Sequence, residues 1–576
     1  MRTKRIKVDF CVVGGGLAGM CAAISAARHG AKVALMHDRP VLGGNASSEI
    51  RMWIGGAHGK NNRETGLVEE FILENYYRNP NGNYSIWDSV LYEKVRFEEN
   101  ITLPLNCTCN DLTMKGNRIK SVRGWQLTTE TWYEVEADLF ADCSGDSILA
   151  PLSGAEYRIG REAASEFNES IEPETADRKT MGLSCLIQAR ETDRPQKFIP
   201  PKWANVYETD EDLPNRGHDI LKTNFWWIEL GGDQDSIHDT EELRDELLKI
   251  AFGVWDHIKN RGDHGADNWV LEWVGFLPGK RESRRYVGDY ILTQNDVRSE
   301  GRFSDIVAYG GWSMDDHHPG GMKYPGYPTT YHPAPSPYGI PYRCLYSRNI
   351  ENLFCAGRNI SVSHAALSST RVMATCATLG QAVGTAASIA VKEGLKPREL
   401  YPSRIRELQQ MLMDDDCYLP WQKREISSLT QRAKLSASEG ADQAENLRNG
   451  IDRPVGEEDN GWFGSLGSWV EYSFDTPQRV QEMRLVFDSN LNRPDPNMPC
   501  RYPLEGVQFH VPESLIRTLR VELLDEKGNW TCHFRLTDNY QRLVRINLDV
   551  TTKALRIIPE ETWGAEKAHI FAWDLY

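Results

Sequence analysis

The sequence predicts an α/β protein with a three-layer domain around a parallel sheet, an inserted α+β domain and a C-terminal β-sandwich of the jelly-roll type. Three observations predict this architecture. Residues 6–40 have the pattern of a strand, a glycine-rich turn, a helix and a second strand. The same order of strand, turn and small-residue helix returns at 353–392. After about residue 430, short alternating strands separated by turn residues follow one another from Trp469 to Trp573, at 469–474, 483–487, 507–510, 519–524, 544–548, 555–558 and 570–573.

Length and charge set the first limits on function. The chain has 576 residues, about four times the length of an average domain, so two or three domains are expected. Its 82 acidic and 66 basic residues give a net charge of −16. Phosphate backbones and anionic lipid surfaces repel such a chain, so we expect no nucleic acid partner. Cys107 and Cys109 are the closest pair among the 12 cysteines, which indicates neither a disulfide framework nor a zinc knuckle.

The first strand and helix of the chain enclose a phosphate-binding motif. The strand is Val8–Val13, the helix is Leu17–His29, and residues 14–19 between them contain the pattern GxGxxG in the context that it requires. Glycines at this spacing let backbone N–H groups approach a pyrophosphate at the positive end of a helix. The residues expected at the pyrophosphate are Gly14, Gly16, Leu17, Ala18 and Gly19.

The second strand, Val33–Met36, departs from the usual pattern at its end. The position that normally carries an acid for the ribose hydroxyls is His37, and the acid arrives one residue later as Asp38. Either Asp38 binds the ribose, or His37 does so as a neutral acceptor.

Chain order favours FAD over NAD as the dinucleotide. An NAD domain is normally complete before the substrate domain begins, whereas FAD needs distant segments to close over its ring. The return segment at 353–392 meets that need, and its helix can point a positive N-terminus at the flavin. The predicted domains are 1–155 (first part of a Rossmann-like FAD-binding domain), 156–345 (inserted substrate domain), 346–425 (return of the FAD-binding domain) and 430–576 (β-sandwich).

Five sequence blocks resemble, in kind and in order, the FAD-dependent oxidoreductases of the glutathione reductase structural class, and within them a bacterial branch found in carbohydrate-utilising species. The blocks are VVGGGLAG (12–19), DRPVLGGNASSEIR (38–51), FADCSGD (140–146), PGKRESRR (278–285) and the stretch from Asn352 to Ser388. The resemblance implies that Gly43, Gly44 and Asn45 lie against the flavin or pyrophosphate, that Gly145 and Asp146 approach the adenosine half, and that Gly357, Arg358 and Arg371 border the isoalloxazine. Arg39 and Ser47, in the second block, are expected at the cofactor as well.

The C-terminal segment resembles, more loosely, discoidin-like (galactose-binding-like) jelly-roll modules. The resemblance lies in ENLRNGIDRP followed by WFGSLGSWVEYSFDTPQRV. Such modules either bind sugars or only pack against their neighbour, and the sequence leaves both possibilities open.

Flavin-dependent dehydrogenation of an alcohol needs a base, for which histidine is suited by its pKa. His364 is the first candidate because it lies between the Gly-Arg turn and the helix expected to meet the ring. Asp315, His317 and His318 form a second candidate cluster for substrate recognition or proton transfer. As metal ligands they would need a partner such as His332, and we expect no metal site.

Together these features predict an FAD-dependent oxidoreductase that dehydrogenates a hydroxyl group of a sugar, glycoside or polyol by hydride transfer to flavin N5. One alternative is a flavin-dependent reductase of an activated double bond, with Arg371 as the acid. The other is a non-catalytic carbohydrate-binding protein with a relic cofactor fold. The electron acceptor and the oligomeric state stay open.

The apolar segments predict where the protein works. The run Val372–Val391 is rich in Ala, Thr and Gly, so we expect a buried helix and not a membrane span. The N-terminus lacks the hydrophobic stretch of a secretory signal. A cytoplasmic protein is therefore expected, or a periplasmic one if a signal peptide has been removed.

Overall fold

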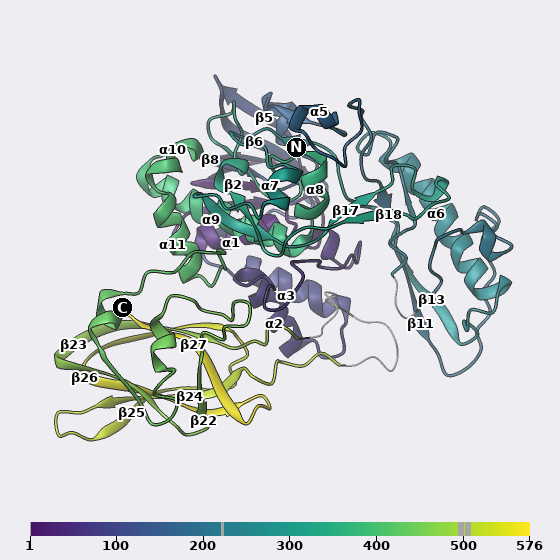
Figure 1. Cartoon of the computed structure of the whole chain (residues 1–576). Coiled ribbons are helices and arrows are strands. Elements are labelled where there is room, and N and C mark those ends of the chain that lie inside the picture. The colour runs from purple at the N-terminus through teal and green to yellow at the C-terminus, as the bar shows by residue number, and fades with distance from the viewer. Residues whose placement is uncertain (1, 221–223, 494–499, 501–507) are drawn as a thin grey trace. The chain divides into compact units, whose positions relative to one another are not determined.

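The computed structural model describes residues 2–220, 224–493, 500 and 508–576. The chain forms two compact units, whose elements are labelled in Figure 1. The first unit comprises Met1–Ala57, Asn81–Leu408 and Pro496–Gln508, and the second comprises His58–Pro80, Gln409–Asp495 and Phe509–Tyr576.

A five-stranded sheet with the strand order β20-β8-β2-β3-β4 is at the centre of the first unit. Its neighbouring strands pair in parallel. Four of the strands are buried along their whole length, as expected of a parallel sheet covered on both faces. The parallel sheet predicted from the two βα segments is therefore confirmed. The strands are β2 (Phe10–Val13), β3 (Val33–Met36), β4 (Ile101–Thr102), β8 (Leu139–Asp142) and β20 (Leu353–Cys355).

Two helices of small residues, α1 (Leu17–Arg28) and α9 (Met373–Glu393), pack against each other beside this sheet. A Cβ on Gly380 or Gly384 of α9 would lie 2.0 or 2.2 Å from a carbonyl oxygen of α1. The glycines therefore let the two backbones touch. By length and composition α9 is the one helix among the described residues that could cross a membrane, but 94% of its apolar window is buried inside the protein.

The return segment differs from the single helix expected over 365–392. It is divided into α8 (His364–Thr370) and α9, with Arg371 and Val372 between them. Val372 has an extended backbone, with ψ at 146°. The break gives α9 an N-terminus of its own next to Arg371.

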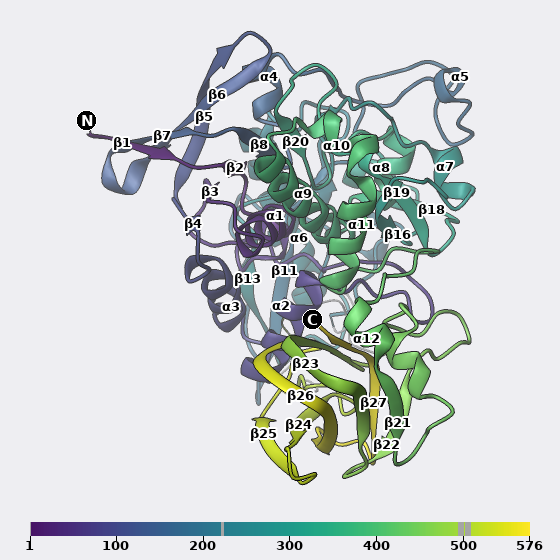
Figure 2. The same ribbon diagram turned by 90° about the vertical axis from the view of Figure 1, so that its left-hand side faces the viewer.

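A second sheet in the first unit has the strand order β1-β7-β6-β5 and lies at the N-terminal end of the chain in Figure 2. The amide of Cys107, at the start of β5, donates to the carbonyl of His37 at 2.8 Å, so this sheet reaches the end of β3. The strands are β1 (Arg2–Lys7), β5 (Cys107–Lys115), β6 (Arg118–Gln126) and β7 (Thr131–Glu136). The helices of this part are α3 (Tyr84–Arg96) and α4 (Leu149–Ser153).

The region inserted between β8 and β20 contains several small sheets and one long helix, α6 (Thr240–Asp256). Its apolar core includes Trp227, Leu247 and Trp255. The strands are β9 (Tyr157–Arg158), β10 (Leu183–Ser184), β11 (Ile187–Glu191), β12 (Glu229–Leu230), β13 (Trp269–Val274), β14 (Gly279–Lys280), β15 (Arg285–Tyr286), β16 (Ile306–Gly310), β17 (Met314–His317), β18 (Thr329–His332) and β19 (Tyr338–Pro341). The short helices are α5 (Ala164–Phe167) and α7 (Gln294–Arg298), and α10 (Pro397–Ser403) follows α9.

The second unit is a β-sandwich-like body in which β23 and β26 are long. Register shifts interrupt β23 between Ser473 and Gln478 and again between Val480 and Glu482. Two strands expected at 469–474 and 483–487 are therefore one bent strand. Of the strand expected at 507–510, residue 507 lies outside the described residues and 508–510 are not in a strand. The strands are β21 (Lys434–Ala437), β22 (Trp462–Ser465), β23 (Val470–Phe487), β24 (Ile516–Leu524), β25 (Trp530–Leu536), β26 (Leu543–Thr562) and β27 (Lys567–Leu575).

Helix α2 (Leu67–Arg78) packs with the sandwich, although the sequence places it within the domain of residues 1–155. Leu73 belongs to the sandwich core. Glu69 makes a bidentate ion pair with Arg493, with both N–O distances at 2.7 Å. Both side chains are buried. The remaining helices of this unit are α11 (Ile405–Asp414), which begins in the first unit, and α12 (Ser428–Arg432).

The Glu69–Arg493 pair predicts an acid-sensitive second unit. Burial alone would raise the pKa of Glu69, but Arg493 outweighs it and holds the pKa at about 2. Because the folded pKa lies below the unfolded value of about 4.3, the stabilisation is complete above that pH and is lost as pH falls toward 2. Glu69→Gln leaves Arg493 buried without its carboxylate and is expected to cost about 3–5 kcal/mol.

Denaturant unfolding of the second unit, measured at neutral pH and at successively lower pH, checks this expectation. Glu526→Gln, at an exposed position of the same unit, is the control. Equal stability of the two variants at neutral pH, or an acid response in Glu69→Gln as steep as that of the wild type, would contradict it.

Candidate functional site

A cavity of about 520 Å³ lies in the first unit. Its walls come from the glycine turn after β2, the loop after β3, the start of β5, the segment after β8 and the N-terminus of α9. The inserted region closes one end with residues of β14 and of the β17–β18 hairpin. These segments are far apart in the chain, and the cavity is where they meet.

Three of the glycines in the turn, Gly14, Gly16 and Gly19, have two different roles. Gly14 has φ at +105°, and a Cβ there would lie 2.4 Å from the backbone of Cys143. A Cβ on Gly19 would lie 1.8 Å from the carbonyl oxygen of Gly14. Gly16, by contrast, has nothing nearer to its Cβ position than the Cα of Gly44 at 3.9 Å. Gly14 and Gly19 thus allow the close backbone contacts of the turn. Gly16 leaves open the side of the turn that faces the cavity.

The loop after β3 lies beside this turn. Gly43 pairs with Gly16 in an isolated parallel bridge, and its amide donates to the carbonyl of Gly15 at 2.9 Å. Gly44 and Asn45 line the cavity with Gly43. Ser47 does not line it, because its hydroxyl donates to the carbonyl of Gly44 at 2.7 Å and the side chain is buried.

His37 and Asp38, at the end of β3, differ in how they are engaged within the protein. Nδ1 of His37 accepts the amide of Gly15 at 3.0 Å, and its Nε2 lies 2.9 Å from the carbonyl of Val41. Burial lowers the pKa of His37 to about 4, so the ring is neutral and both nitrogens are engaged within the protein. Asp38 is largely exposed and lines the cavity together with Arg39. Asp38 is therefore the residue with a carboxylate available to a ribose.

Strand β5 contributes residues that the sequence did not indicate. Cys107, Thr108 and Cys109 line the cavity, and the amide of Cys107 donates to the carbonyl of His37, next to Asp38. They belong to a different sheet from the glycine turn, so no local pattern places them at this site.

A pair of cations meets the carboxylate after β8. Asp146 accepts Lys280 Nζ at 2.7 Å and Arg358 Nη2 at 2.9 Å. Burial raises the pKa of Asp146, but the two cations outweigh that effect and lower it below its usual range. A Cβ on Gly145 would lie 2.7 Å from the guanidinium of Arg358. Asp146 therefore serves to place Arg358 and Lys280 at the cavity wall, which also includes Gly357.

The N-terminus of α9 faces the cavity. Arg371, Val372, Met373 and Cys376 line it there. The amide of Ala374 donates a hydrogen bond to the carbonyl of Gly55 at 2.9 Å. The positive end of the helix dipole and the Arg371 guanidinium thus lie at the same end of the cavity, where they favour negative charge.

His317 lies between two carboxylates at the same end of the cavity as Arg371. Nδ1 of His317 lies 2.7 Å from Glu229 Oε2, and its Nε2 lies 3.3 Å from Asp315 Oδ2. His317 and Asp315 line the cavity, and Glu229 is buried behind them. Adjacent side chains of a strand normally point to opposite faces, and Asp315 and His317 share a face because they are two residues apart on β17.

Two arginines balance these carboxylates. Arg371 Nη2 lies 3.1 Å from Asp315 Oδ2, and Arg281 Nη1 lies 3.4 Å from Glu229 Oε1. Burial raises the pKa of Asp315, but His317 and then Arg371 outweigh it and lower the pKa. Both carboxylates therefore stay ionised, and His317 lies in a charge-balanced group.

Aromatic side chains complete this end. The ring of Trp226 meets His317 edge to face, with centroids 5.2 Å apart. Tyr331, on β18, lines the cavity, and burial followed by the charge of Asp315 raises its pKa to about 12. Its hydroxyl is therefore protonated at neutral pH. Trp53 and Trp312 also line the cavity.

His364, the first candidate for the base, lies outside the cavity lining. Its Nδ1 is 2.9 Å from Glu282 and its Nε2 is 3.2 Å from Asp316. Burial lowers the pKa of His364, but these carboxylates outweigh that effect and raise it well above its usual range. A buried imidazolium that donates to two carboxylates has no lone pair with which to take a proton. His364 therefore links the two chain segments that carry Glu282 and Asp316.

His318 and Gly19 lie outside the cavity lining too. His318 is exposed and stacks on Tyr324, with ring centroids 3.6 Å apart. The structure brings fifteen of the expected cofactor residues and three of the expected catalytic residues to the cavity, Arg371 being counted in both groups. They are Gly14, Gly16, Leu17, Ala18, His37, Asp38, Arg39, Gly43, Gly44, Asn45, Gly145, Asp146, Gly357, Arg358, Arg371, Asp315 and His317.

Comparison with known proteins gives one family and several distant structural matches. The family model described as "FAD dependent oxidoreductase" matches residues 9–412. No curated protein matches the chain.

Three matched structures are sugar-binding modules. The family 32 carbohydrate-binding module of Streptococcus pneumoniae EndoD is 17% identical, with a TM-score of 0.21, and the match covers 26% of this chain and 99% of that one. Chitosan-binding module 1 of a Paenibacillus sp. IK-5 chitosanase/glucanase is 13% identical, with a TM-score of 0.19, and the match covers 26% of this chain and 98% of that one. The family 32 module of C. perfringens NanJ is 11% identical, with a TM-score of 0.19, and the match covers 25% of this chain and 94% of that one.

Proposed function

The chain belongs to the family of FAD-dependent oxidoreductases, and from that premise we propose that it oxidises a hydroxyl group of a sugar, glycoside or polyol, with His317 as the base. The family match also supports enzymatic activity over a non-catalytic role. Within the family we place the chain in the glutathione reductase structural class and its carbohydrate-associated branch, on the sequence blocks that it shares with them.

The cavity residues fit FAD. The open side of Gly16 lies at the N-terminus of α1, where main-chain amides and the helix dipole suit a pyrophosphate. Asp38 suits a ribose, and Thr108 lies beside it for the adenine end. At the other end, Arg371 and the N-terminus of α9 suit an electron-rich ring. FAD bound in this way supplies an acceptor for the hydride of the substrate.

His317 is the base that the geometry favours. If Nδ1 carries the proton and donates to Glu229, Nε2 has a lone pair for the substrate once the substrate hydroxyl replaces the 3.3 Å contact with Asp315, which Arg371 and Thr329 also hold. When Nε2 takes the proton of a substrate hydroxyl, Asp315 and Glu229 stabilise the imidazolium that results. Arg371 and Arg281 balance the negative charge of these carboxylates before the substrate binds. The single observation that carries the proposal is this histidine, which lines the cavity and lies between Glu229 and Asp315.

The lining favours a polyhydroxylated substrate. Trp226, Trp53 and Trp312 offer aromatic faces to the apolar side of a sugar ring. Asp315 and Arg371 offer an acceptor and a donor for hydroxyl groups. A small apolar alcohol would leave these polar groups unpaired, at a cost in binding.

A screen of sugars, glycosides and polyols for anaerobic bleaching of the flavin tests this proposal. At least one such compound is expected to bleach the protein-bound flavin in a single turnover, and its oxidised product is expected in the filtrate. The proposed reaction is wrong if no compound with a hydroxyl group bleaches the flavin, although a chemical reductant bleaches it in the same preparation.

Reduction of an activated double bond is the second candidate. Tyr331, whose hydroxyl stays protonated, and Arg371 both line the substrate end and offer the acid that this reaction needs. Reoxidation of the dye-reduced protein by an enone or enoate, with no bleaching by alcohols, would favour this reaction.

A further inference from the structure

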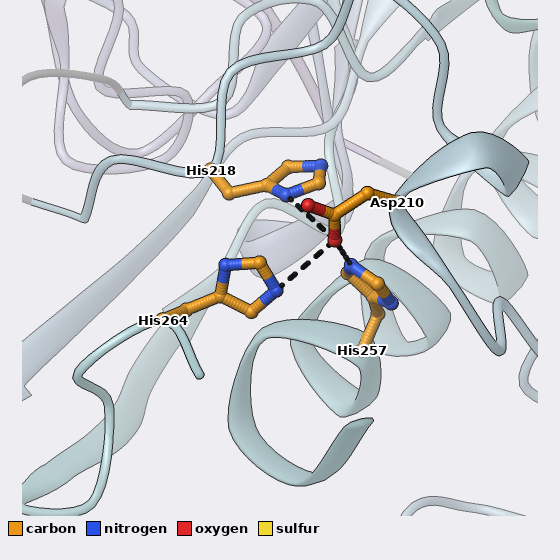
Figure 3. A group of neighbouring side chains, drawn as sticks. All are labelled: Asp210, His218, His257 and His264. Atoms are coloured by element: carbon orange, nitrogen blue, oxygen red, sulfur yellow. Dashed lines mark hydrogen bonds and ion pairs between the residues drawn. The ribbon is translucent and has the colours of Figure 1, made fainter. Parts of the chain in front are cut away.

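Three histidines and an aspartate converge in the inserted region of the first unit, away from the cavity (Figure 3). Asp210 begins a short 3-10 turn, Asp210–Asp212, and His218 follows in the next loop. His257 stands at the end of α6, where the helix continues as a π-turn, His257–Arg261. His264 lies in the loop after it. Single π-turns in helices occur often at functional sites.

The distances from Asp210 are close to those of a tetrahedral metal site, and all four ligand atoms lie within 4.8 Å of one another. Asp210 Oδ1 lies 3.0 Å from His257 Nε2, 3.4 Å from His264 Nε2 and 3.7 Å from His218 Nδ1. Zinc bonds of about 2.0–2.1 Å in a tetrahedron place neighbouring ligand atoms about 3.3 Å apart. The three imidazole centroids are 4.9, 4.9 and 5.0 Å from one another, so the rings form one compact cluster.

The contacts of His257 fit a metal ion in this cluster. Its Nδ1 lies 3.0 Å from the carbonyl oxygen of Tyr207, which can only accept, so Nδ1 carries the proton. In the neutral ring, Nε2 then directs a lone pair at a carboxylate oxygen 3.0 Å away. Two acceptors so close need a proton or a metal ion between them. A backbone carbonyl on the far nitrogen is also the usual arrangement for a metal-bound histidine.

The nitrogen of His264 leads to the same conclusion. Its Nε2 is buried and makes no hydrogen bond, although Asp210 Oδ1 is 3.4 Å away. A buried nitrogen that faces a carboxylate without a hydrogen bond is explained if both atoms are directed at a third partner.

We propose that Asp210 Oδ1, His218 Nδ1, His257 Nε2 and His264 Nε2 bind a structural Zn²⁺ ion. Three imidazoles and one carboxylate suit zinc and not calcium or magnesium, which prefer oxygen ligands. Four protein ligands close the coordination sphere, which is typical of structural and not of catalytic zinc. This proposal replaces our expectation that the chain holds no metal site.

The ion would fix the segment 207–218 to the end of α6. Within that segment, Arg216 donates to the carbonyls of Gly321, Tyr324 and Gly326, in the loop that joins β17 to β18. Strand β17 carries His317 to the cavity. The 17 residues of α6 span about 25 Å, and Thr240 at the other end lines the cavity, so the ion supports the substrate end without touching it.

Metal analysis of the full-length, FAD-loaded protein tests the proposal, with Zn²⁺ as the probe. We expect about one zinc per chain, with a nitrogen and oxygen shell at about 2.0–2.1 Å by X-ray absorption. Chelation is expected to lower the melting temperature, and added Zn²⁺ to restore it. The flavin content is read in the same samples, so a failure of the zinc proposal is distinguishable from a failure of the cofactor proposal.

Two variants and one control locate the ion. His264→Ala and Asp210→Asn are expected to weaken zinc binding by more than the 10–100-fold that is typical of outer-sphere changes. Asp210 is an exposed residue, and asparagine keeps its shape, so this second variant is expected to fold even if His264→Ala does not. His238→Ala, at an exposed histidine paired with Asp235, is the control and should bind zinc as the wild type does.

Zinc well below one equivalent in the wild type, with no thermal shift on adding Zn²⁺, would overturn the proposal. So would an Asp210→Asn protein that binds zinc as tightly as His238→Ala does.

Discussion

Gly16→Val is expected to give a folded protein that lacks FAD. Gly16 has φ at −69° and ψ at 176°, a conformation that valine adopts freely, and its Cβ position is open. The added methyl groups enter the space where the pyrophosphate meets the turn. We expect a loss of FAD affinity of at least 100-fold, equivalent to about 2.8 kcal/mol, with little change in the stability of the apoprotein.

Flavin stoichiometry after gel filtration, with circular dichroism of the same sample, measures this effect. Gly30→Ala at the opposite end of α1 is the control: Gly30 has φ at +93°, and its Cβ position has no atom within 4 Å. That variant is strained but does not touch the cavity, and it should stay yellow. A Gly16→Val protein with a full complement of FAD would show that the pyrophosphate does not lie at this turn.

His317→Gln is expected to slow flavin reduction by about 10²–10⁴, the usual contribution of a positioned general base. Glutamine keeps a polar group against Glu229 but cannot take the proton of the substrate. The FAD content should not change, because the other groups expected to hold FAD are intact. Single-turnover anaerobic reduction by the substrate found in the screen is the measurement.

The neighbouring histidine supplies the control. His318→Gln changes an exposed ring that stacks on Tyr324, outside the cavity lining, and should leave the reduction rate unchanged. Equal rates in His317→Gln and the wild type would remove His317 as the base.

Local sequence patterns were enough to predict the phosphate-binding part of the site. The glycine turn, the strands on either side of it and Asp38 lie within one βαβ segment, so spacing along the chain determines their geometry. The return of a strand at 353–355 beside β8 was also predictable, because strand, turn and helix repeat the pattern of the first segment.

The proposed base, His317, could not be identified in the same way. His364 lies next to the Gly-Arg turn in sequence, but its partners Glu282 and Asp316 come from distant segments and convert it to a buried cation. His317 depends in turn on Glu229, 88 residues away. The charge state of a histidine is set by such tertiary neighbours, which single-residue patterns do not contain.

Three other features were missed for related reasons. Thr108 lines the cavity from a sheet that the cofactor motif does not belong to. The break between α8 and α9 at Val372 has neither glycine nor proline to mark it. In the sandwich, strands expected to be separate are continuous because bulges bend them without ending them.

A crystal structure of the FAD-loaded protein tests the central claim most directly. We expect the pyrophosphate at the amides around Gly16, the adenosine beside Asp38 and Thr108, and the flavin ring at the N-terminus of α9 within reach of the His317 group. A cofactor bound in the opposite direction, or a flavin ring far from both Arg371 and His317, would contradict this account of the site.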